Sequence, residues 1–158
     1  MNPPVIYVAE AMPANNRIMT FRVTARDGRG LYGFDDVTIT VFSRLSLLDI
    51  GPFAVTELGY GAVWPRGSKQ TVSWNVAHTN LPPIDCSRVR ISLVIRGNES
   101  NPIILADNIP NTDASAVITV PSDVPLTTMG RVKVEAVGNI FFNVSVADIQ
   151  IVEAQAVR

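Results

Sequence analysis

Short runs that alternate between apolar and polar side chains are the feature that most constrains how this chain can fold. Residues 17–26 and 36–42 both show this alternation, and a Gly-rich stretch with three glycines separates them. The apolar positions are Phe21, Val23 and Ala25 in the first run and Val37, Ile39 and Val41 in the second. A period of two residues is typical of a β-strand with one buried face. We therefore predict a β-hairpin with a long loop over residues 27–35.

A second series of alternating runs follows, with turn residues between the runs. These runs are Phe53–Glu57, Lys69–Val76, Ser87–Arg96, Pro102–Ala106, Ser115–Val120, Gly130–Val137 and Asn143–Val152. About seven short strands with turns between them are typical of an immunoglobulin-like antiparallel β-sandwich, and no helical periodicity is sustained. We expect an all-β chain with a hairpin arm over residues 1–43, a linker over 44–51 and a sandwich over 52–158. Trp74, in phase with Val72, should face the core.

The charge balance excludes two classes of partner. The chain has 158 residues, 13 of them basic and 14 acidic, which gives a formal net charge of −1. Nucleic-acid binding and polybasic membrane contact both need a basic face, so we expect neither. The apolar runs are also far shorter than the ~20 residues that span a bilayer, so no membrane insertion is expected.

Residues for catalysis are scarce. The chain has one histidine, His78, and one cysteine, Cys86, and it lacks the HExxH, CxxC, GxSxG and GxxxxGK motifs. A nucleophile–histidine system would rest entirely on His78, which lies among loop residues. We therefore predict that the chain is not an enzyme and uses no cofactor. Cys86 is expected to be an inert thiol, with a reactive or intermolecular cysteine as the alternative.

Acidic residues near the Gly-rich stretch are weak candidates for a calcium site. Asp27, Asp35 and Asp36 supply the hard oxygen ligands that Ca²⁺ prefers. Their spacing matches no EF-hand loop, and aspartates are also common in turns. The ordinary role of these residues in a turn is therefore the competing interpretation.

Three aromatic residues are candidates for binding a ligand such as a carbohydrate. Tyr60 and Trp64 lie in a Gly-rich segment, and Phe141 follows another turn. Exposed aromatic rings can stack against a sugar, but the same rings can instead cover the open end of a sandwich. The sequence leaves both interpretations open.

Three stretches resemble a known accessory module. They are GPF at residues 51–53, the pattern W-x-x-G-S-x-Q-T-V-x-W over 64–74, and RVKVEAVGNIFFNVS over 131–145. Together they resemble the immunoglobulin-like repeat found C-terminal to the catalytic domain of secreted, reprolysin-like zinc metalloproteases of Bacteroidetes-type bacteria. Residues 11–42 look like the tail of the preceding domain. The resemblance implies an extracellular or cell-surface, non-catalytic module, because the zinc ligands of that family lie in another domain.

The predicted hairpin arm suggests how such a module could act. Its apolar face, made of Phe21, Val23, Val37, Ile39 and Val41, needs a partner surface, because a lone two-stranded hairpin is marginally stable in water. The arm could extend its own sandwich, stay frayed as the remnant of another domain, or complete the sheet of a neighbouring copy. We therefore expect an interaction or accessory module with protein partners. The alternative is a structural subunit that forms filaments by strand complementation.

Overall fold

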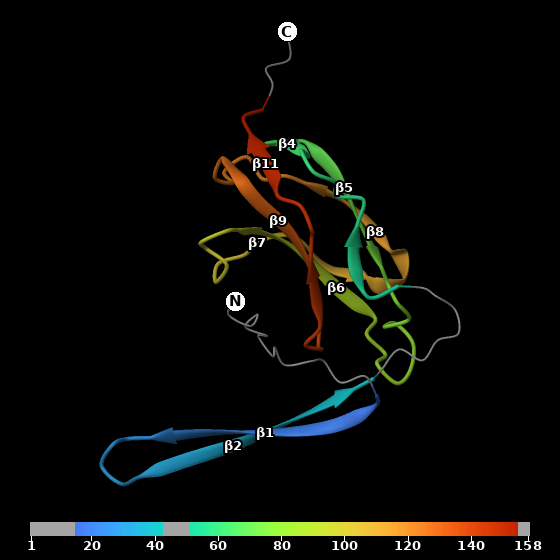
Figure 1. The fold of residues 1–158 in the computed structure, drawn as a ribbon. Coiled ribbons are helices and arrows are strands. Elements are labelled where there is room, and N and C mark those ends of the chain that lie inside the picture. Colours follow the sequence, from blue (N-terminus) through green and yellow to red (C-terminus); the bar gives the residue numbers. More distant parts are fainter. Residues whose placement is uncertain (1–14, 43–50, 155–158) are drawn as a thin grey trace, which may run out of the picture. The chain divides into compact units, whose positions relative to one another are not determined.

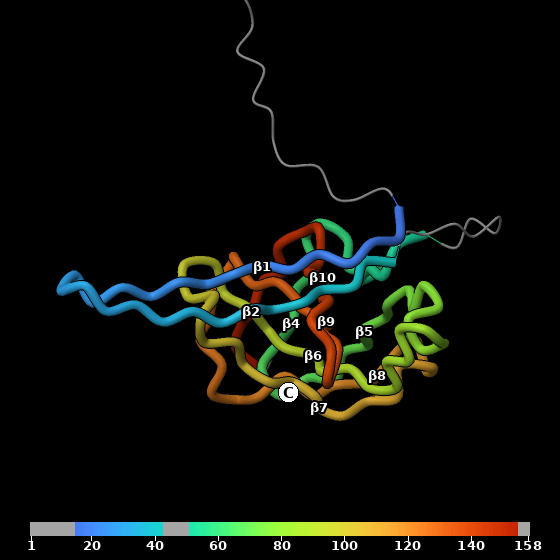
Figure 2. Tube along the Cα trace, turned by 90° about the horizontal axis from the view of Figure 1, so that it is seen from below, coloured from blue at the N-terminus to red at the C-terminus, as the bar shows by residue number. Residues whose placement is uncertain are grey.

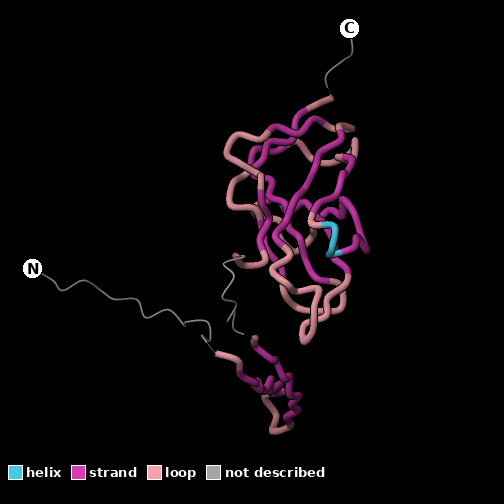
Figure 3. Tube along the Cα trace, turned by 90° about the vertical axis from the view of Figure 1, so that its right-hand side faces the viewer, coloured by secondary structure: helices cyan, strands magenta, loops and turns pink. Residues whose placement is uncertain are grey.

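The computed structural model describes residues 15–42 and 51–154. The chain divides into two compact units, Met1–Leu48 and Asp49–Arg158. Most of the predicted linker, including its aliphatic residues, lies outside the described residues. Within the described residues the fold is all-β, as predicted, with one short 3₁₀ turn, η1 (Asn111–Asp113) (Figure 3). No helix in this part of the chain has the length and apolarity needed to cross a membrane.

The first unit contains a two-stranded antiparallel hairpin, β1 (Arg17–Arg26) and β2 (Tyr32–Val41), whose strands run side by side (Figures 1 and 2). The predicted hairpin is confirmed, but its loop is shorter than expected because β2 begins at Tyr32. Asp27 closes the turn by accepting backbone N–H groups from Arg29 and Leu31 at 2.7 and 3.0 Å. Gly28 and Gly30 supply the positive φ angles that the turn requires.

The second unit consists of two sheets that enclose one core. The smaller sheet has the order β3 (Ala54–Thr56), β5 (Lys69–Asn75), β8 (Ser115–Thr119). The larger sheet has the order β4 (Val63–Pro65), β11 (Ile149–Val152), β9 (Thr127–Ala136), β6 (Arg88–Ile95), β7 (Ile103–Pro110), and β10 (Phe142–Val144) also pairs with β9. The arrangement is therefore sandwich-like.

Two details differ from the predicted antiparallel sandwich of about seven strands. Residues 51–154 contain nine strands, because the short strand β4 was missed and the predicted strand over 143–152 is two strands, β10 and β11. The break between them contains Ser145, whose hydroxyl accepts the Val132 N–H and donates to the Ala147 carbonyl. The larger sheet is also mixed, because β4 and β11 run parallel.

Both sheets contribute to the core. It includes Val72, Trp74 and Ile118 from the smaller sheet and a larger apolar set from the other sheet: Trp64, Val89, Ile91, Leu93, Val132, Val134, Ile149 and Ile151. Trp74 is 2% exposed, which confirms that it faces the core. Alternate residues of β5 and β9 therefore point inward, as the period of two predicts, whereas β6 buries Ile91, Ser92 and Leu93 in succession.

Candidate functional site

The clearest exposed apolar surface that the structure describes lies on one face of the hairpin. Residues directly opposite each other in an antiparallel pair project to the same face, and the register sets Phe21 opposite Val37 and Met19 opposite Ile39. Phe21 and Val37 are about half exposed, and Val23 is 68% exposed. The predicted residues Phe21, Val23, Val37, Ile39 and Val41 thus share one face. Met19 belongs to the same face but was not predicted.

The opposite face of the hairpin carries charged and hydroxyl side chains that bond to one another, together with the exposed side chains of Ile18, Tyr32 and Phe34. Arg22 makes a two-pronged ion pair with Asp36 at 2.7 and 2.8 Å and lies over the Phe34 ring at 4.1 Å. The hydrogen bond from Arg22 holds the pKa of Asp36 below its usual value. Thr20 and Thr38 form a further cross-strand contact. The face with Phe21 and Val37 is therefore the more apolar of the two, and its side chains are exposed for contact.

The aspartates proposed as calcium ligands do not form a site. Asp35 and Asp36 are neighbours in β2, so their side chains project to opposite faces of the hairpin. Asp36 is bound to Arg22, and Asp27 caps the turn. Among the described residues there is no group of three or more His, Cys, Asp or Glu side chains that could hold a metal ion. The calcium hypothesis is therefore wrong for these residues.

The three aromatic candidates lie in different environments. Trp64 is 3% exposed and belongs to the core, so its ring is not available to a ligand; this corrects the ligand-facing interpretation. Phe141 is half-buried and packs edge-on against Phe53, with 4.9 Å between ring centroids. Tyr60 is 88% exposed. The three rings therefore do not form a common exposed surface for stacking a sugar.

The histidine and the cysteine lie in or beside the loop between β5 and β6. His78 is exposed, with a positive φ of 59°. The Cys86 thiol is 4% exposed and donates a hydrogen bond to the Arg88 carbonyl at 3.2 Å. Because this thiol is enclosed and bonded, an inert role fits its environment better than a reactive one.

A buried polar network, which the sequence pattern did not predict, fixes the same loop. Asn111 is fully buried, and its side-chain oxygen accepts the Trp74 indole N–H at 3.0 Å. Its amide nitrogen donates to the Thr79 hydroxyl and the Cys86 carbonyl at 2.9 and 3.0 Å. One side chain therefore connects β5, the β5–β6 loop and η1.

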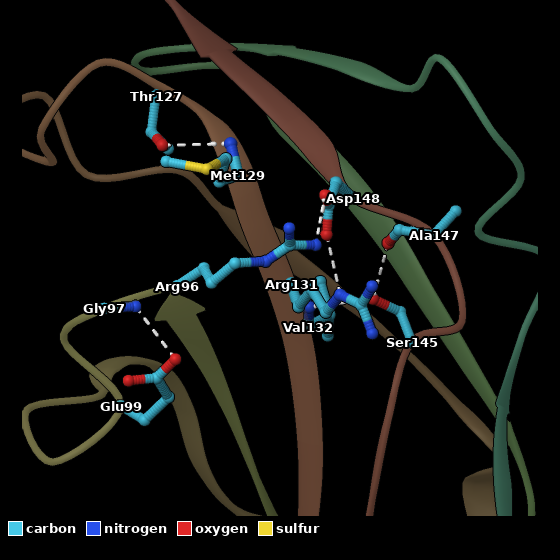
Figure 4. Close-up of polar contacts among 10 residues, drawn as sticks. All are labelled: Arg96, Gly97, Glu99, Thr127, Met129, Arg131, Val132, Ser145, Ala147 and Asp148. Carbon is cyan, nitrogen blue, oxygen red and sulfur yellow. Dashed lines mark hydrogen bonds and ion pairs between the residues drawn. The ribbon is translucent and has the colours of Figure 1, made fainter.

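A hollow on the outer face of the larger sheet contains a cluster of charged side chains. It has a volume of about 270 Å³ and is lined by Val94, Arg96, Glu99, Arg131 and Val144. Arg96 and Arg131 both reach Asp148, each at 2.7 Å (Figure 4). The Arg131 hydrogen bond, assisted by Arg96, keeps the pKa of Asp148 below its usual value.

These charges largely neutralise each other. Two arginines face Asp148 and Glu99, and Glu99 also accepts the Gly97 N–H at 2.8 Å. Exposed ion pairs of this kind add little stability because water and salt screen them. With two positive and two negative groups, the hollow offers no net charge to attract an ionic ligand, so it is a weaker candidate site than the hairpin face.

Comparison with known proteins does not assign the chain to a family: no protein-family model matches it, and no curated protein sequence matches it.

Proposed function

We propose that this chain is a non-catalytic interaction module of a larger secreted or cell-surface protein, and that hairpin β1–β2 is the element that contacts a protein partner. The observation that carries the proposal is the exposed apolar face of the hairpin, centred on Phe21 and Val37. Large apolar side chains gathered on an exposed surface are typical of protein-contact sites. The charge balance and the apolar face of the hairpin both favour protein over nucleic acid as the partner.

The fold class of the second unit and the extracellular location are part of the same proposal. We assign the second unit to the immunoglobulin-like class, because two sheets pack over one core that contains the buried Trp74. The extracellular location rests on the resemblance of residues 51–53, 64–74 and 131–145 to the accessory repeat of secreted metalloproteases. A zinc-dependent activity of such a protein would belong to another domain.

A second version of the function is favoured by the backbone of the hairpin. Among the described residues, β1 and β2 pair with each other and with no other strand, so each has an outer edge with backbone groups that can pair with another chain. In this version the chain is a structural subunit of a surface assembly, joined by β-strand complementation.

Amide hydrogen exchange on the dilute, intact chain tests whether the hairpin needs a partner. We expect the amides of β1 and β2 to exchange almost as fast as those of an unfolded chain, because an isolated two-stranded hairpin is marginally stable. The amides of β6 and β9, which lie inside the larger sheet, should be strongly protected. Equal protection of β1, β2 and β6 in the dilute monomer would mean that the hairpin is already stably packed, and the proposal would fail.

A further inference from the structure

Strand β8 is the least protected edge among the described strands of the second unit. It ends the smaller sheet, pairs only with β5, and its sequence SAVIT has no charge and no proline. The other long edge strand, β7, has two register shifts in its pairing and a left-handed residue, Asn108. The edge strands β3 and β4 have three residues each. Natural sheets protect their edges with bulges, charges and short strands, and β8 has no such device apart from its modest length.

The hydrogen-bond pattern shows which backbone groups β8 presents at this edge. The N–H of Val120 donates to the Ser68 carbonyl, and the N–H of Trp74 donates to the Ala114 carbonyl. In an antiparallel ladder bonded pairs alternate with non-bonded pairs, so Ala116 and Ile118 also bond toward β5. The N–H and C=O groups of Ser115, Val117 and Thr119 therefore point away from the sheet, where another strand could bind them.

A partly covered apolar surface lies next to this edge. Strand β7 contacts β8, and several of its apolar side chains pack on the core but are only partly buried. These are Ile103, Leu105, Ala106 and Ile109. A strand added beside β8 would cover them with its own apolar face. The acceptor site thus combines unpaired backbone groups with apolar surface.

We propose that strand β2 of a second copy of this chain binds at the edge of β8. Residues 37–41 of β2 read VTITV, five uncharged residues that match the five of β8 in length and alternation. Val37, Ile39 and Val41 would face the half-covered β7 surface, and Thr38 and Thr40 would face solvent. The contact is head-to-tail, so each copy can both donate β2 and accept at β8, which gives an open chain of subunits.

The backbone of β2 fits this role. The Asp27 N–H donates to the Leu31 carbonyl, and the β1–β2 register is continuous from there. The bonded pairs therefore include Val37, Ile39 and Val41, so the backbone groups of Thr38 and Thr40 point to the outer edge of the hairpin. This inference rests on the proposed function, since it uses the same hairpin and names the surface that receives it.

The test follows amide exchange and solution mass of the intact chain as its concentration is raised. We expect the mass to rise, and the amides of Ser115, Val117 and Thr119 to become protected together with those of Thr38 and Thr40. The amides of Ala116 and Ile118 should be protected at every concentration. Val117→Lys, which places a charge on the edge, should abolish both changes. Its matched control is Thr71→Lys, on the neighbouring strand directly opposite Val117, and it should behave like the parent.

A second variant of Val117 separates the loss of edge pairing from other effects of the added charge. Val117→Pro removes an N–H that β5 does not use, and proline is tolerated at the edge of a sheet. It should also block association while tryptophan fluorescence reports an intact core.

The remaining outcomes decide the matter. A chain that stays monomeric at all concentrations overturns the proposal. Association that survives both Val117 variants also overturns the proposal. If that association is nevertheless lost in Val37→Lys, the hairpin is still the contact element, and only the assignment of β8 as the acceptor is wrong. Association insensitive to all three variants would contradict the proposed function as well.

Discussion

Replacing Trp74 with alanine is expected to destabilise the second unit by about 3–5 kcal/mol, the usual cost of removing a large aromatic side chain from a core. Trp74 is 2% exposed, and its indole N–H is bonded to Asn111, so the substitution removes both packing and a buried hydrogen bond. Since small domains are stable by only about 5–15 kcal/mol, we expect the thermal midpoint to fall by more than about 10 °C. Calorimetry measures this directly.

Two further variants keep this prediction testable if the alanine variant does not fold. Trp74→Phe retains most of the ring but leaves the Asn111 oxygen without its donor, and should cost about 1–3 kcal/mol. Tyr60→Ala changes an 88% exposed aromatic residue, and it should change stability by no more than about 0.5 kcal/mol. If Trp74→Ala melted within a few degrees of the parent, the assignment of Trp74 to the centre of the core would be wrong.

Replacing Asn111 with alanine should have the second-largest effect. The change leaves the Trp74 N–H and the Cys86 carbonyl without their partner and removes a donor to Thr79. Each buried group left unpaired costs about 1–3 kcal/mol, so the total should be roughly 3 kcal/mol or more. Urea unfolding, with the change read from the midpoint, is the appropriate measurement.

The neighbouring residue provides a matched control for Asn111. Thr112 lies in the same 3₁₀ turn but is exposed, so Thr112→Ala should leave the urea midpoint nearly unchanged. We also expect the amides of residues 79–86 to lose protection in Asn111→Ala, because Asn111 fixes this loop. Equal midpoints for the two variants would refute the role of Asn111.

The strands that alternate clearly could be predicted from the sequence, and the others could not. The runs over 17–26 and 69–76 match β1 and β5 closely, because one face of each contrasts chemically with the other. Strand β4 was missed because it has only three residues and ends in proline. Strand β7 extends four residues further than predicted, to Pro110; its register shifts interrupt the alternation that the prediction relied on.

For the candidate sites, features set by neighbouring residues could be predicted from the sequence, whereas features set by residues far apart in the chain could not. The apolar hairpin face could be predicted, because cross-strand neighbours follow from alternation once a hairpin is assumed. The calcium hypothesis failed because Asp35 and Asp36, although adjacent, point to opposite faces. The role of Asn111 could not be predicted, because its partners lie 25–37 positions away along the chain.

The central claim is that the apolar face of the hairpin is a protein-contacting surface, and solution mass measured by light scattering tests it most directly. The intact chain should exceed its monomer mass of 17.1 kDa as concentration rises. Val37→Lys, in the middle of the apolar face, should remain monomeric. Thr20→Lys, on strand β1 and on the opposite face of the hairpin, should associate like the parent. A parent chain that stays at 17.1 kDa would refute contact between copies of the chain, and two lysine variants that associate equally would refute the role of the apolar face.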